Sequence, residues 1–512
     1  MHGVRKLSLA LPAFARINVV MAQVSEEATQ PVLRRPRLPR MFWFAVALLI
    51  AGSALVRSIN HDESQYVAAI ALMRQGLPYR DFAYLQTPLQ PLILSPLALV
   101  PAGSVLIATR AANAIFGFAT VILLSIALRR RASARATMTA LAALVCTGAF
   151  LLASSLARND ALAMVLLAAA LPPLLTATET RSARLFAAGA AALGLAVSTK
   201  INAALPAAGA GLFTLIRARQ YGPRTLFAFC AGLLVGLLPI LIMAAIAPGE
   251  FRFYVFDYNL EAPRQWWTSI SQEGELDPLR RAIKLVGLAA LGSVLVAFIA
   301  IPFDRSRTDV RRMLEFMIVG GLIGAFLPVP ALVQYLDPLL PPLFVRFGLA
   351  LDGAQPTRRN LLLVLSTPGS IAGLASASVA RFAGLDLVRT AAVGQQVAVI
   401  AHGGTVVTLA PEYVAGNGVA LDPRFAAGPF LYRTRGQLAR RAEEEGRAVS
   451  AETLDRALAA NPPAVIVVGA ETTAFLPNFP RGLDGPLRVW ATAHGYRLTS
   501  LRSGLVAFVR LR

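Results

Sequence analysis

Residues 136–177 read ATMTALAALVCTGAFLLASSLARNDALAMVLLAAALPPLLTA, one long apolar run with the polar triplet Arg158–Asp160 near its middle. A helix needs roughly 17–25 apolar residues to cross the hydrocarbon core of a bilayer. The stretch is therefore typical of two transmembrane helices, at 136–154 and 160–177, joined by a short polar link. Similar apolar runs recur along most of the chain.

The composition of the whole chain is that of a membrane protein. Of its 512 residues, 56% are hydrophobic and only 15% are charged, whereas a soluble protein of this length needs a charged surface over its core. The net charge is +21, but the basic residues mostly punctuate the apolar runs, so nucleic acid is excluded as a partner. Two cysteines and four scattered histidines offer neither a disulfide framework nor a zinc-ligand pair.

The apolar runs predict eleven transmembrane helices. They lie at 41–59, 107–128, 136–154, 160–177, 184–199, 201–216, 225–247, 282–302, 314–332, 335–351 and 360–378. The run 89–100 is too short to span comfortably and contains two prolines, so it is interpreted as a helix at the membrane interface. Counting it as a span would place Arg129–Arg131 outside. Treating it as interfacial puts every arginine-rich loop in the cytoplasm, as the positive-inside rule requires.

Three regions follow from this topology. Residues 1–40 form a cytoplasmic tail, in which either Met1 or Met21 is the true start, and 41–379 form a transmembrane domain with a large outer loop, 60–106. Residues 380–512 alternate short β-rich runs with polar helical stretches, which predicts a periplasmic α/β domain. Its predicted strands are 397–401, 406–409, 465–468 and 505–509, and its predicted helices are 437–445 and 451–460. The expected fold class is an all-α polytopic protein of the bacterial inner membrane with a small C-terminal α/β domain outside the membrane.

The outer loop contains the stretch richest in potential chemistry, HDESQYVAAIALMRQGLPYRDFAYLQTPLQP at 61–91. Asp62 and Glu63 stand at the start of a predicted helix, where acidic residues suit the positive end of the helix dipole and Asp62 could serve as the N-cap. The functional alternative is a carboxylate at the membrane surface that acts as general base on an acceptor hydroxyl. The residues alone leave both interpretations open.

Other ionisable residues are predicted at the same outer face. Asp160, Lys200 and Arg110 each lie at the end of an apolar run. Ionisable groups near membrane depth are costly and often functional, although tight turns and snorkelling towards water explain them equally. The loop 250–281 adds Arg264 among aromatic residues. Those aromatics suit either anchoring at the membrane interface or stacking on a sugar, and an arginine there could bind phosphate through two hydrogen bonds.

The order of these motifs resembles the glycosyltransferase C superfamily. Within it, the likeness is to membrane proteins of the dolichyl-phosphate-mannose protein mannosyltransferase and aminoarabinose-transferase type. The similar segments are DESQY with GLPYRDF and PLQP in the first outer loop, TRAANAIFG with Arg110, SLARNDALAMVLLAAAL with Asp160, GLAVSTKINAAL with Lys200, and QYLDPLLPPL with Tyr335. The resemblance covers about residues 41–350.

This resemblance implies a hexosyl or pentosyl transferase that takes a sugar from a polyprenyl-phosphate donor and inverts the anomeric carbon. Asp62 would be the base and Glu63 its close partner. The candidate donor-binding residues are Arg80, Arg110, Asp160, Lys200, Arg264 and Tyr335. The acceptor would be a glycan, a lipid or a protein, and membrane lipids would surround the chain. No cofactor and no metal ligands are expected, with a divalent metal kept as the alternative.

One departure from the family leaves other functions open. Related bacterial members often place a lysine directly before a Pro-Pro pair after the acidic motif, whereas this chain has Leu85-Gln86-Thr87-Pro88. Arg80 could supply the missing charge. The alternatives are a flippase or transporter for lipid-linked sugars, and a non-catalytic envelope-assembly protein of the same fold. A transporter predicts charges paired at mid-span and an internal repeat, and no repeat is visible.

Overall fold

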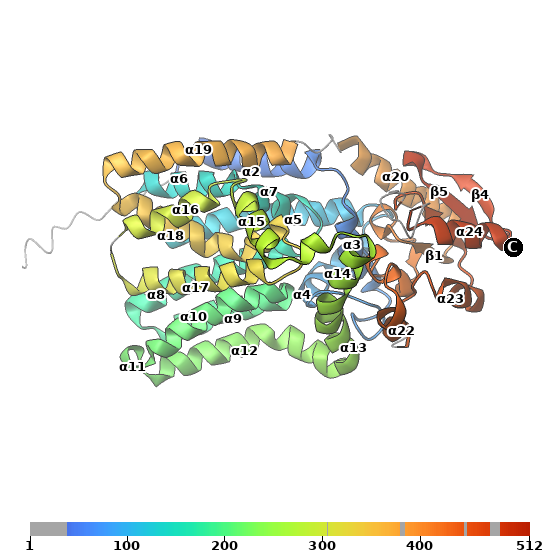
Figure 1. The fold of residues 1–512 in the computed structure, drawn as a ribbon, viewed down its shortest axis with the longest axis horizontal. Helices are drawn as coiled ribbons and strands as arrows, with labels where there is room; N and C mark the ends of the chain where they lie inside the picture. Colours follow the sequence, from blue (N-terminus) through green and yellow to red (C-terminus); the bar gives the residue numbers. More distant parts are fainter. Residues whose placement is uncertain (1–37, 305, 379–383, 445–447, 472–481, 512) are drawn as a thin grey trace, which may run out of the picture. The chain divides into compact units, whose positions relative to one another are not determined.

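A computed structural model describes residues 38–304, 306–378, 384–444, 448–471 and 482–511. The helices of the predicted transmembrane domain form a bundle in which most of them run along one common direction (Figure 1). They are α2 (Arg40–Val56), α5 (Val105–Leu128), α6 (Ala134–Val145), α7 (Gly148–Ser155), α8 (Asp160–Thr180), α9 (Ala183–Thr199), α10 (Ala204–Ile216), α12 (Pro223–Ile246), α15 (Pro278–Ala289), α16 (Val294–Ala300), α17 (Asp309–Phe326), α18 (Leu340–Gly353) and α19 (Pro356–Ser378).

Each of the eleven predicted spans overlaps one or more of these helices. Among the described residues, α5, α8 and α12 are long and apolar enough to cross a membrane singly. Three further pairs of helical segments, each bent by 67–99°, reach that length only if the two members of a pair form one span. The pairs are α2 with residues 61–72, α6 with α7, and α15 with residues 294–303. Length and composition therefore support three to six spans, and the number eleven stays a prediction.

The surface of the bundle is apolar. On α12, the side chains of Leu234, Leu238 and Ile242 are each roughly half exposed. A soluble protein rarely leaves so continuous an apolar face open to water, whereas the hydrocarbon of a bilayer solvates it without cost.

Short elements connect the long helices. They are η1 (His61–Glu63), α3 (Ser64–Leu72), α4 (Leu89–Leu94), η2 (Ser95–Leu99), η3 (Ile201–Ala203), α11 (Ala218–Tyr221), α13 (Pro248–Arg252), η4 (Phe253–Asp257), α14 (Tyr258–Ser269), η5 (Glu273–Leu276), η6 (Ile301–Phe303) and η7 (Val333–Leu339). The run 89–100 is thus helical, as α4 and η2, and too short to span.

The start of the outer loop is capped differently from the sequence expectation. The side chain of Asn60, not of Asp62, accepts the hydrogen bond, from the Asp62 amide at 2.8 Å. Glu63 accepts in return from the Asn60 amide at 2.9 Å, which completes a capping box. Because Asn60 does the capping, the carboxylate of Asp62 is left free to face its neighbours.

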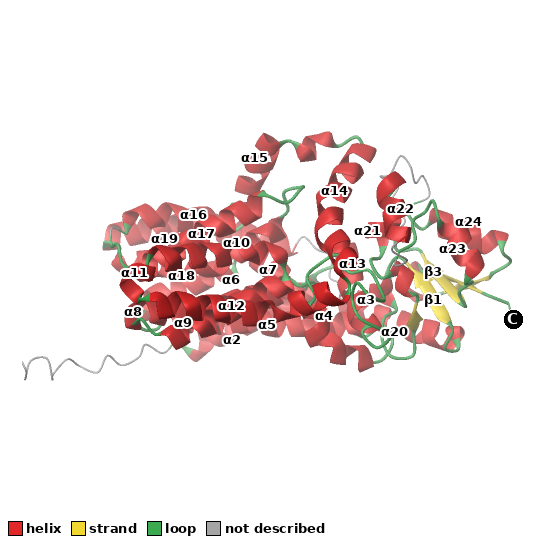
Figure 2. Ribbon diagram, turned by 90° about the horizontal axis from the view of Figure 1, so that it is seen from below, coloured by secondary structure: helices red, strands yellow, loops and turns green. Residues whose placement is uncertain are grey.

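The C-terminal region is an α/β unit at one end of the bundle (Figure 2). Its elements are α20 (Gly384–Ala401), β1 (Thr405–Thr408), η8 (Pro411–Tyr413), β2 (Ala420–Leu421), η9 (Pro423–Phe425), α21 (Pro429–Tyr432), α22 (Gly436–Glu444), α23 (Leu454–Ala460), β3 (Val465–Val468), α24 (Gly485–Ala493), β4 (Arg497–Ser500), η10 (Arg502–Gly504) and β5 (Val506–Val509). The strand order is β2-β1-β3-β5-β4. Strand β1 runs parallel to β2 and β3, and β5 runs antiparallel to β3 and β4.

One predicted strand, 397–401, is wrong, because these residues end helix α20. Val393, Val397 and Ala401 recur every four residues and are buried on one helical face. That spacing outweighs the β propensity of a short valine-rich run. The other three predicted strands match β1, β3 and β5 to within one or two residues, and the predicted helices contain α22 and α23 apart from one residue.

The C-terminal unit packs directly on the outer loop. One apolar cluster contains Tyr66 and Ile70 of α3 together with Val406 and Val465 of the sheet. The backbone of Asn417 also donates to the carbonyl of Val100 at 2.7 Å. The two segments therefore fold as one body over the end of the bundle where the polar residues gather.

Candidate active site

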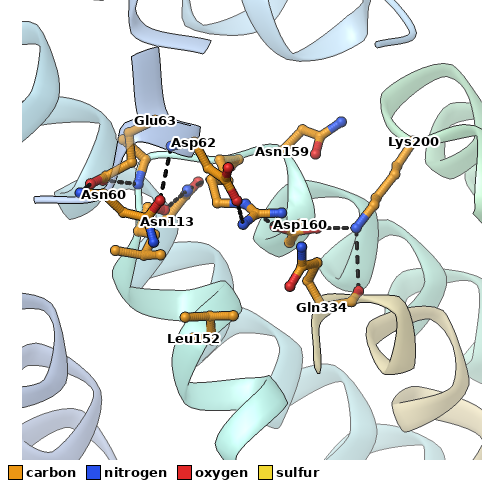
Figure 3. A network of polar contacts seen from close by, with 12 residues as sticks. Asn60, Asp62, Glu63, Asn113, Leu152, Asn159, Asp160, Lys200 and Gln334 are labelled. Carbon is orange, nitrogen blue, oxygen red and sulfur yellow. Dashed lines mark hydrogen bonds and ion pairs between the residues drawn. The ribbon is translucent and has the colours of Figure 1, made fainter. Parts of the chain in front are cut away.

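Four interruptions of the helices meet at that end of the bundle. They are the turn η1, the link between α7 and α8, the break between α9 and η3, and the irregular turn η7. Figure 3 shows that Asp62, Asp160, Lys200 and Gln334, one from each interruption, point into a single polar network. Polar groups at such breaks are tolerated where protein surrounds them and supplies their partners.

Glu63 and Arg110 form the buried anchor of the outer loop. Arg110 donates to Glu63 through Nε at 2.8 Å and through Nη2 at 2.6 Å, and both side chains are almost fully buried. Arg110 also donates to the carbonyls of Arg57 at 2.8 Å and Ser58 at 3.0 Å, while the amide of Ala157 donates to Glu63 at 2.6 Å. Through these hydrogen bonds the pair ties α2, α5, the end of α7 and the outer loop together.

Asp62 lies beside that anchor and remains about a quarter exposed. Arg158 Nη1 donates to its carboxylate at 2.6 Å, and His61 Nε2 lies 3.2 Å from the other oxygen. Burial alone would raise the pKa of Asp62, but the charge of Arg158 and the hydrogen bond from His61 outweigh burial and hold that pKa below its ordinary range. The carboxylate is therefore ionised at neutral pH and still reachable.

Arg158 bridges Asp62 to a second carboxylate, Asp160, which begins α8. Its Nε lies 2.9 Å from Asp160 Oδ2. Asp160 is fully buried and also accepts a hydrogen bond from Lys200 Nζ, which in turn lies 3.3 Å from the carbonyl of Gln334. Two carboxylates and two cations thus alternate in one row of ion pairs, so their charges compensate each other.

Amide side chains hold the interrupted backbone in place. Asn113 of α5 donates to the carbonyl of Arg158 at 2.7 Å, and Asn159 donates to the carbonyl of Thr199 at 2.7 Å. The second bond fixes the α7–α8 link to the end of α9, immediately before Lys200. Because the partners of Asp62 are positioned by buried amides, the cluster is preorganised.

No family model matches this chain, and neither does any curated protein sequence. Solved structures do. ArnT from Cupriavidus metallidurans matches in its apo state with a TM-score of 0.58 at 16% identity, over 92% of this chain and 97% of that one. The same protein bound to undecaprenyl phosphate matches with a TM-score of 0.56, also at 16% identity, over 91% and 97%. The apo oligosaccharyltransferase of Archaeoglobus fulgidus matches with 0.50 at 12% identity, over 84% and 69%.

The chain has the glycosyltransferase C fold. The structural likeness spans nearly the whole of ArnT, including the C-terminal unit, whereas the sequence resemblance ended near residue 350. Below 20% identity, the agreement lies in the path of the backbone and not in matched side chains. The roles of individual residues therefore have to come from the geometry of this chain.

Within this glycosyltransferase C fold, the six predicted donor-binding residues divide into three groups, of which Arg110, paired with Glu63, is one by itself. Asp160, Lys200 and Tyr335 belong to the polar cluster, with Lys200 Nζ 5.8 Å from the centre of the Tyr335 ring. Arg80 and Arg264 do not take part in it. Arg80 is half exposed and paired with its neighbour Asp81, and Arg264 is exposed on α14.

Two residues of the cluster were not singled out from the sequence. Asp337 of η7 is buried, and its carboxyl oxygens accept no hydrogen bond from a described donor. Arg158 appeared only as part of a polar triplet, although it holds both carboxylates. A sequence pattern could identify neither role, because Arg158 meets Asp62 across 96 positions of chain.

A cofactor or metal was not expected from the sequence. In the part of the chain that the structure describes, no three His, Cys, Asp or Glu side chains are grouped so that they could hold a metal ion. The cations that face the carboxylates are side chains, Arg158 and Lys200. Independence from metal stays a prediction.

Proposed function

We propose that this chain is a membrane glycosyltransferase that moves a sugar from a polyprenyl-phosphate donor to a glycan, lipid or protein acceptor on the outer side of the bilayer. The observation that carries the proposal is the ionised, partly exposed carboxylate of Asp62 in a preorganised cluster of cations. The glycosyltransferase C fold supports it, as does undecaprenyl phosphate bound to ArnT, a structure of the same fold.

In this proposal Asp62 acts as the general base. The acceptor hydroxyl attacks the anomeric carbon from the face opposite the phosphate, and the bond between that carbon and the phosphate oxygen breaks with inversion. The hydroxyl proton passes to Asp62, and polyprenyl phosphate leaves with the bonding electrons. Because the pKa of Asp62 is low, proton transfer has to occur late, when the attacking oxygen has become acidic by bonding to carbon.

Cations of the cluster then stabilise the charge that develops on the leaving phosphate. Lys200 is the best-placed candidate, because Asp160, the carbonyl of Gln334 and the ring of Tyr335 fix its ammonium group. An ammonium group that is already held in place does not have to reorganise when charge develops on the phosphate. Electrostatic catalysis gains most from this preorganisation. Asp160 accordingly orients a cation, and Glu63 with Arg110 positions the loop that carries the base.

The position of the charges favours an enzyme over a transporter. Lys200 follows the last residue of α9 and Asp160 is the first residue of α8, so both stand at helix ends. A transporter predicts charges buried at mid-span on broken helices of repeated halves. Residues Leu85–Pro88 lack the lysine and Pro-Pro pair that related proteins have there, so the identity of the sugar donor stays open. An assay of sugar transfer tests the non-catalytic alternative.

The Asp62→Asn variant tests the function directly. In membranes supplied with a radiolabelled polyprenyl-phosphate sugar, wild type transfers label to an acceptor, and the variant is expected to lose at least about 100-fold of that rate. Glu261→Gln, on an exposed carboxylate of the outer helix α14, is the matched control and keeps full activity. Equal rates in wild type and Asp62→Asn would exclude this base, and label that only changes leaflet would identify a flippase.

A further inference from the structure

The segment from Gly428 to Arg433 of the C-terminal unit lies against the loop that carries Asp62. Gly428 has a backbone φ of +56°, and a Cβ at this position would come within 2.5 Å of Ser64 Oγ at the start of α3. The Tyr258 hydroxyl of α14 also donates to the carbonyl of Phe430 at 2.8 Å. Glycine is therefore needed here so that the segment can approach the outer loop closely.

Arg433 ends this segment with an unusual environment. Its guanidinium lies 4.1 Å from the centre of the Trp266 ring and 5.1 Å from that of Phe430. None of the described residues makes a hydrogen bond or ion pair with it, and Tyr258, Asp62 and Glu471 act on it only at longer range. Aromatic faces attract a cation without satisfying its N–H donors, so the donors of this half-buried side chain have no acceptor among the described residues and are left to solvent or a ligand.

The side chain also stands on the Asp62 side of the cluster. The ring of Phe430, against which Arg433 packs, lies 5.8 Å from the ring of His61, and His61 contacts Asp62. The charge of Arg433 contributes, after that of Arg158 and the contact with His61, to the lowering of the pKa of Asp62. Arg433 therefore lies near the proposed base, on the segment of the C-terminal unit that packs against the loop carrying Asp62.

We propose that Arg433 is a substrate-binding residue that the C-terminal unit contributes to the active site, and that it binds a phosphate group. A guanidinium presents paired N–H donors in one plane that match the oxygens of phosphate, and stacking on Trp266 holds that plane fixed before the substrate arrives. The inference rests on the proposed glycosyltransferase function for its substrates, but the residue and its ligand chemistry come from the contacts above.

A second arginine in the same unit shows what a satisfied site looks like. Arg441 also lies over an aromatic ring, Phe253 at 4.6 Å, yet its Nη2 is paired with Asp257 at 3.0 Å. Arg433 shares the stacking and lacks the carboxylate. The difference between the two predicts that only Arg433 gains a strong partner when an anion is added.

The phosphate could belong to the lipid donor or to the acceptor, and binding measurements separate the two. The full chain in lipid nanodiscs, with Trp43, Trp267 and Trp490 changed to phenylalanine, reports on Arg433 through the fluorescence of Trp266. It is titrated with undecaprenyl phosphate, and with inorganic phosphate both alone and after saturation with undecaprenyl phosphate. Arg433→Ala is compared with Arg441→Ala.

We expect Arg433→Ala to weaken binding of one probe by about 10- to 100-fold, the usual loss of charge-assisted hydrogen bonds. Arg441→Ala should bind as the parent does. If inorganic phosphate no longer binds after saturation with undecaprenyl phosphate, the site holds the donor phosphate; if it still binds, the site serves the acceptor.

The same affinities in Arg433→Ala and Arg441→Ala would overturn the proposal, as would the absence of binding of both probes to the parent protein. Because Trp266 also loses its stacked partner in Arg433→Ala, the affinity is confirmed by calorimetry. A parent protein that binds the probes but transfers no sugar would refute the proposed function and leave the role of Arg433 standing.

Discussion

The ion pair between Glu63 and Arg110 is placed where a single substitution has the largest effect. Both side chains are buried and both use their full bonding capacity on the loop around Asp62. Removing one partner of such a pair leaves the other charge buried without compensation, which costs far more than the pair itself contributes.

Arg110→Ala should therefore destabilise the protein by about 3–5 kcal/mol. The measurement is the free energy of unfolding in detergent, followed by circular dichroism at increasing denaturant. Arg80→Ala serves as control, because Arg80 is exposed and its partner Asp81 stays solvated; it should unfold as wild type does. A variant at Arg110 as stable as the one at Arg80 would contradict the anchoring role.

The neighbourhood of Asp62 predicts how the rate depends on pH. Asp62, as the proposed base, works only when it is ionised. Because its pKa in the folded protein lies below the ordinary 3.8, the rate of sugar transfer should stay high down to pH 3.8 and fall only in stronger acid. In acid His61 is protonated, and its charge helps to lower the pKa of Asp62. His61→Asn removes the charge, so the pKa of Asp62 rises and the acidic limb of kcat/KM moves to higher pH.

The profile of kcat/KM against pH is the measurement, with His402→Asn as the matched control. His402 is an exposed residue beyond α20, and its positive φ of 47° is one that asparagine accepts. Its profile should overlay that of wild type. An unmoved acidic limb in His61→Asn, in protein still folded at that pH, would show that the titrating base is not Asp62.

At the scale of elements, the contact between α9 and α12 depends on glycine. A Cβ at Gly236 would lie 2.1 Å from the carbonyl oxygen of Ala191, and one at Gly232 would lie 2.1 Å from that of Ala187. Backbones this close gain dispersion energy along their whole length, which is the main force between helices in lipid. Since Lys200 directly follows the last residue of α9, the packing also sets the position of the cation.

Gly236→Ala should force α9 and α12 apart, lower the midpoint of thermal unfolding by several degrees and reduce sugar transfer. Gly52→Ala in α2 makes the same change at a position where a Cβ meets nothing within 4 Å, and it should be neutral or slightly stabilising. Thermal scans of the two purified variants, with transfer assays alongside, make the comparison. Equal midpoints would mean that the helices tolerate a wider spacing.

For the whole molecule, the decisive property is the side of the membrane on which each end of the bundle lies. We predict that the arginine-rich loops are cytoplasmic and that the Asp62 cluster faces out. Single cysteines at the exposed positions Gln75 and Arg130, in a Cys146→Ser, Cys230→Ser background, test this with a membrane-impermeant thiol reagent on intact cells. Labelling at 75 but not at 130 is expected, and the reverse pattern would place the site in the cytoplasm.

The sequence by itself determined the helical bundle and the types of polar residue that interrupt its apolar runs. Apolar runs and their arginine-rich ends indicated a membrane protein, because crossing lipid imposes a length and a composition that local sequence has to satisfy. The order of the motifs added the resemblance to the glycosyltransferase C superfamily. The C-terminal strands were also visible locally, except at 397–401, where a burial period of four residues competed with β propensity.

Only the tertiary structure decided which of those residues meet. Glu63 was expected to assist the base and Arg110 to bind the donor, and the fold pairs them as an anchor. Arg158 joins Asp62 to Asp160, and Arg433 approaches from a region that offered no motif. Apart from the pair Arg158 and Asp160, these contacts link positions 47 to 167 residues apart. Charge pairing depends on distance in space, and no periodicity of the chain encodes that distance until the helices have packed.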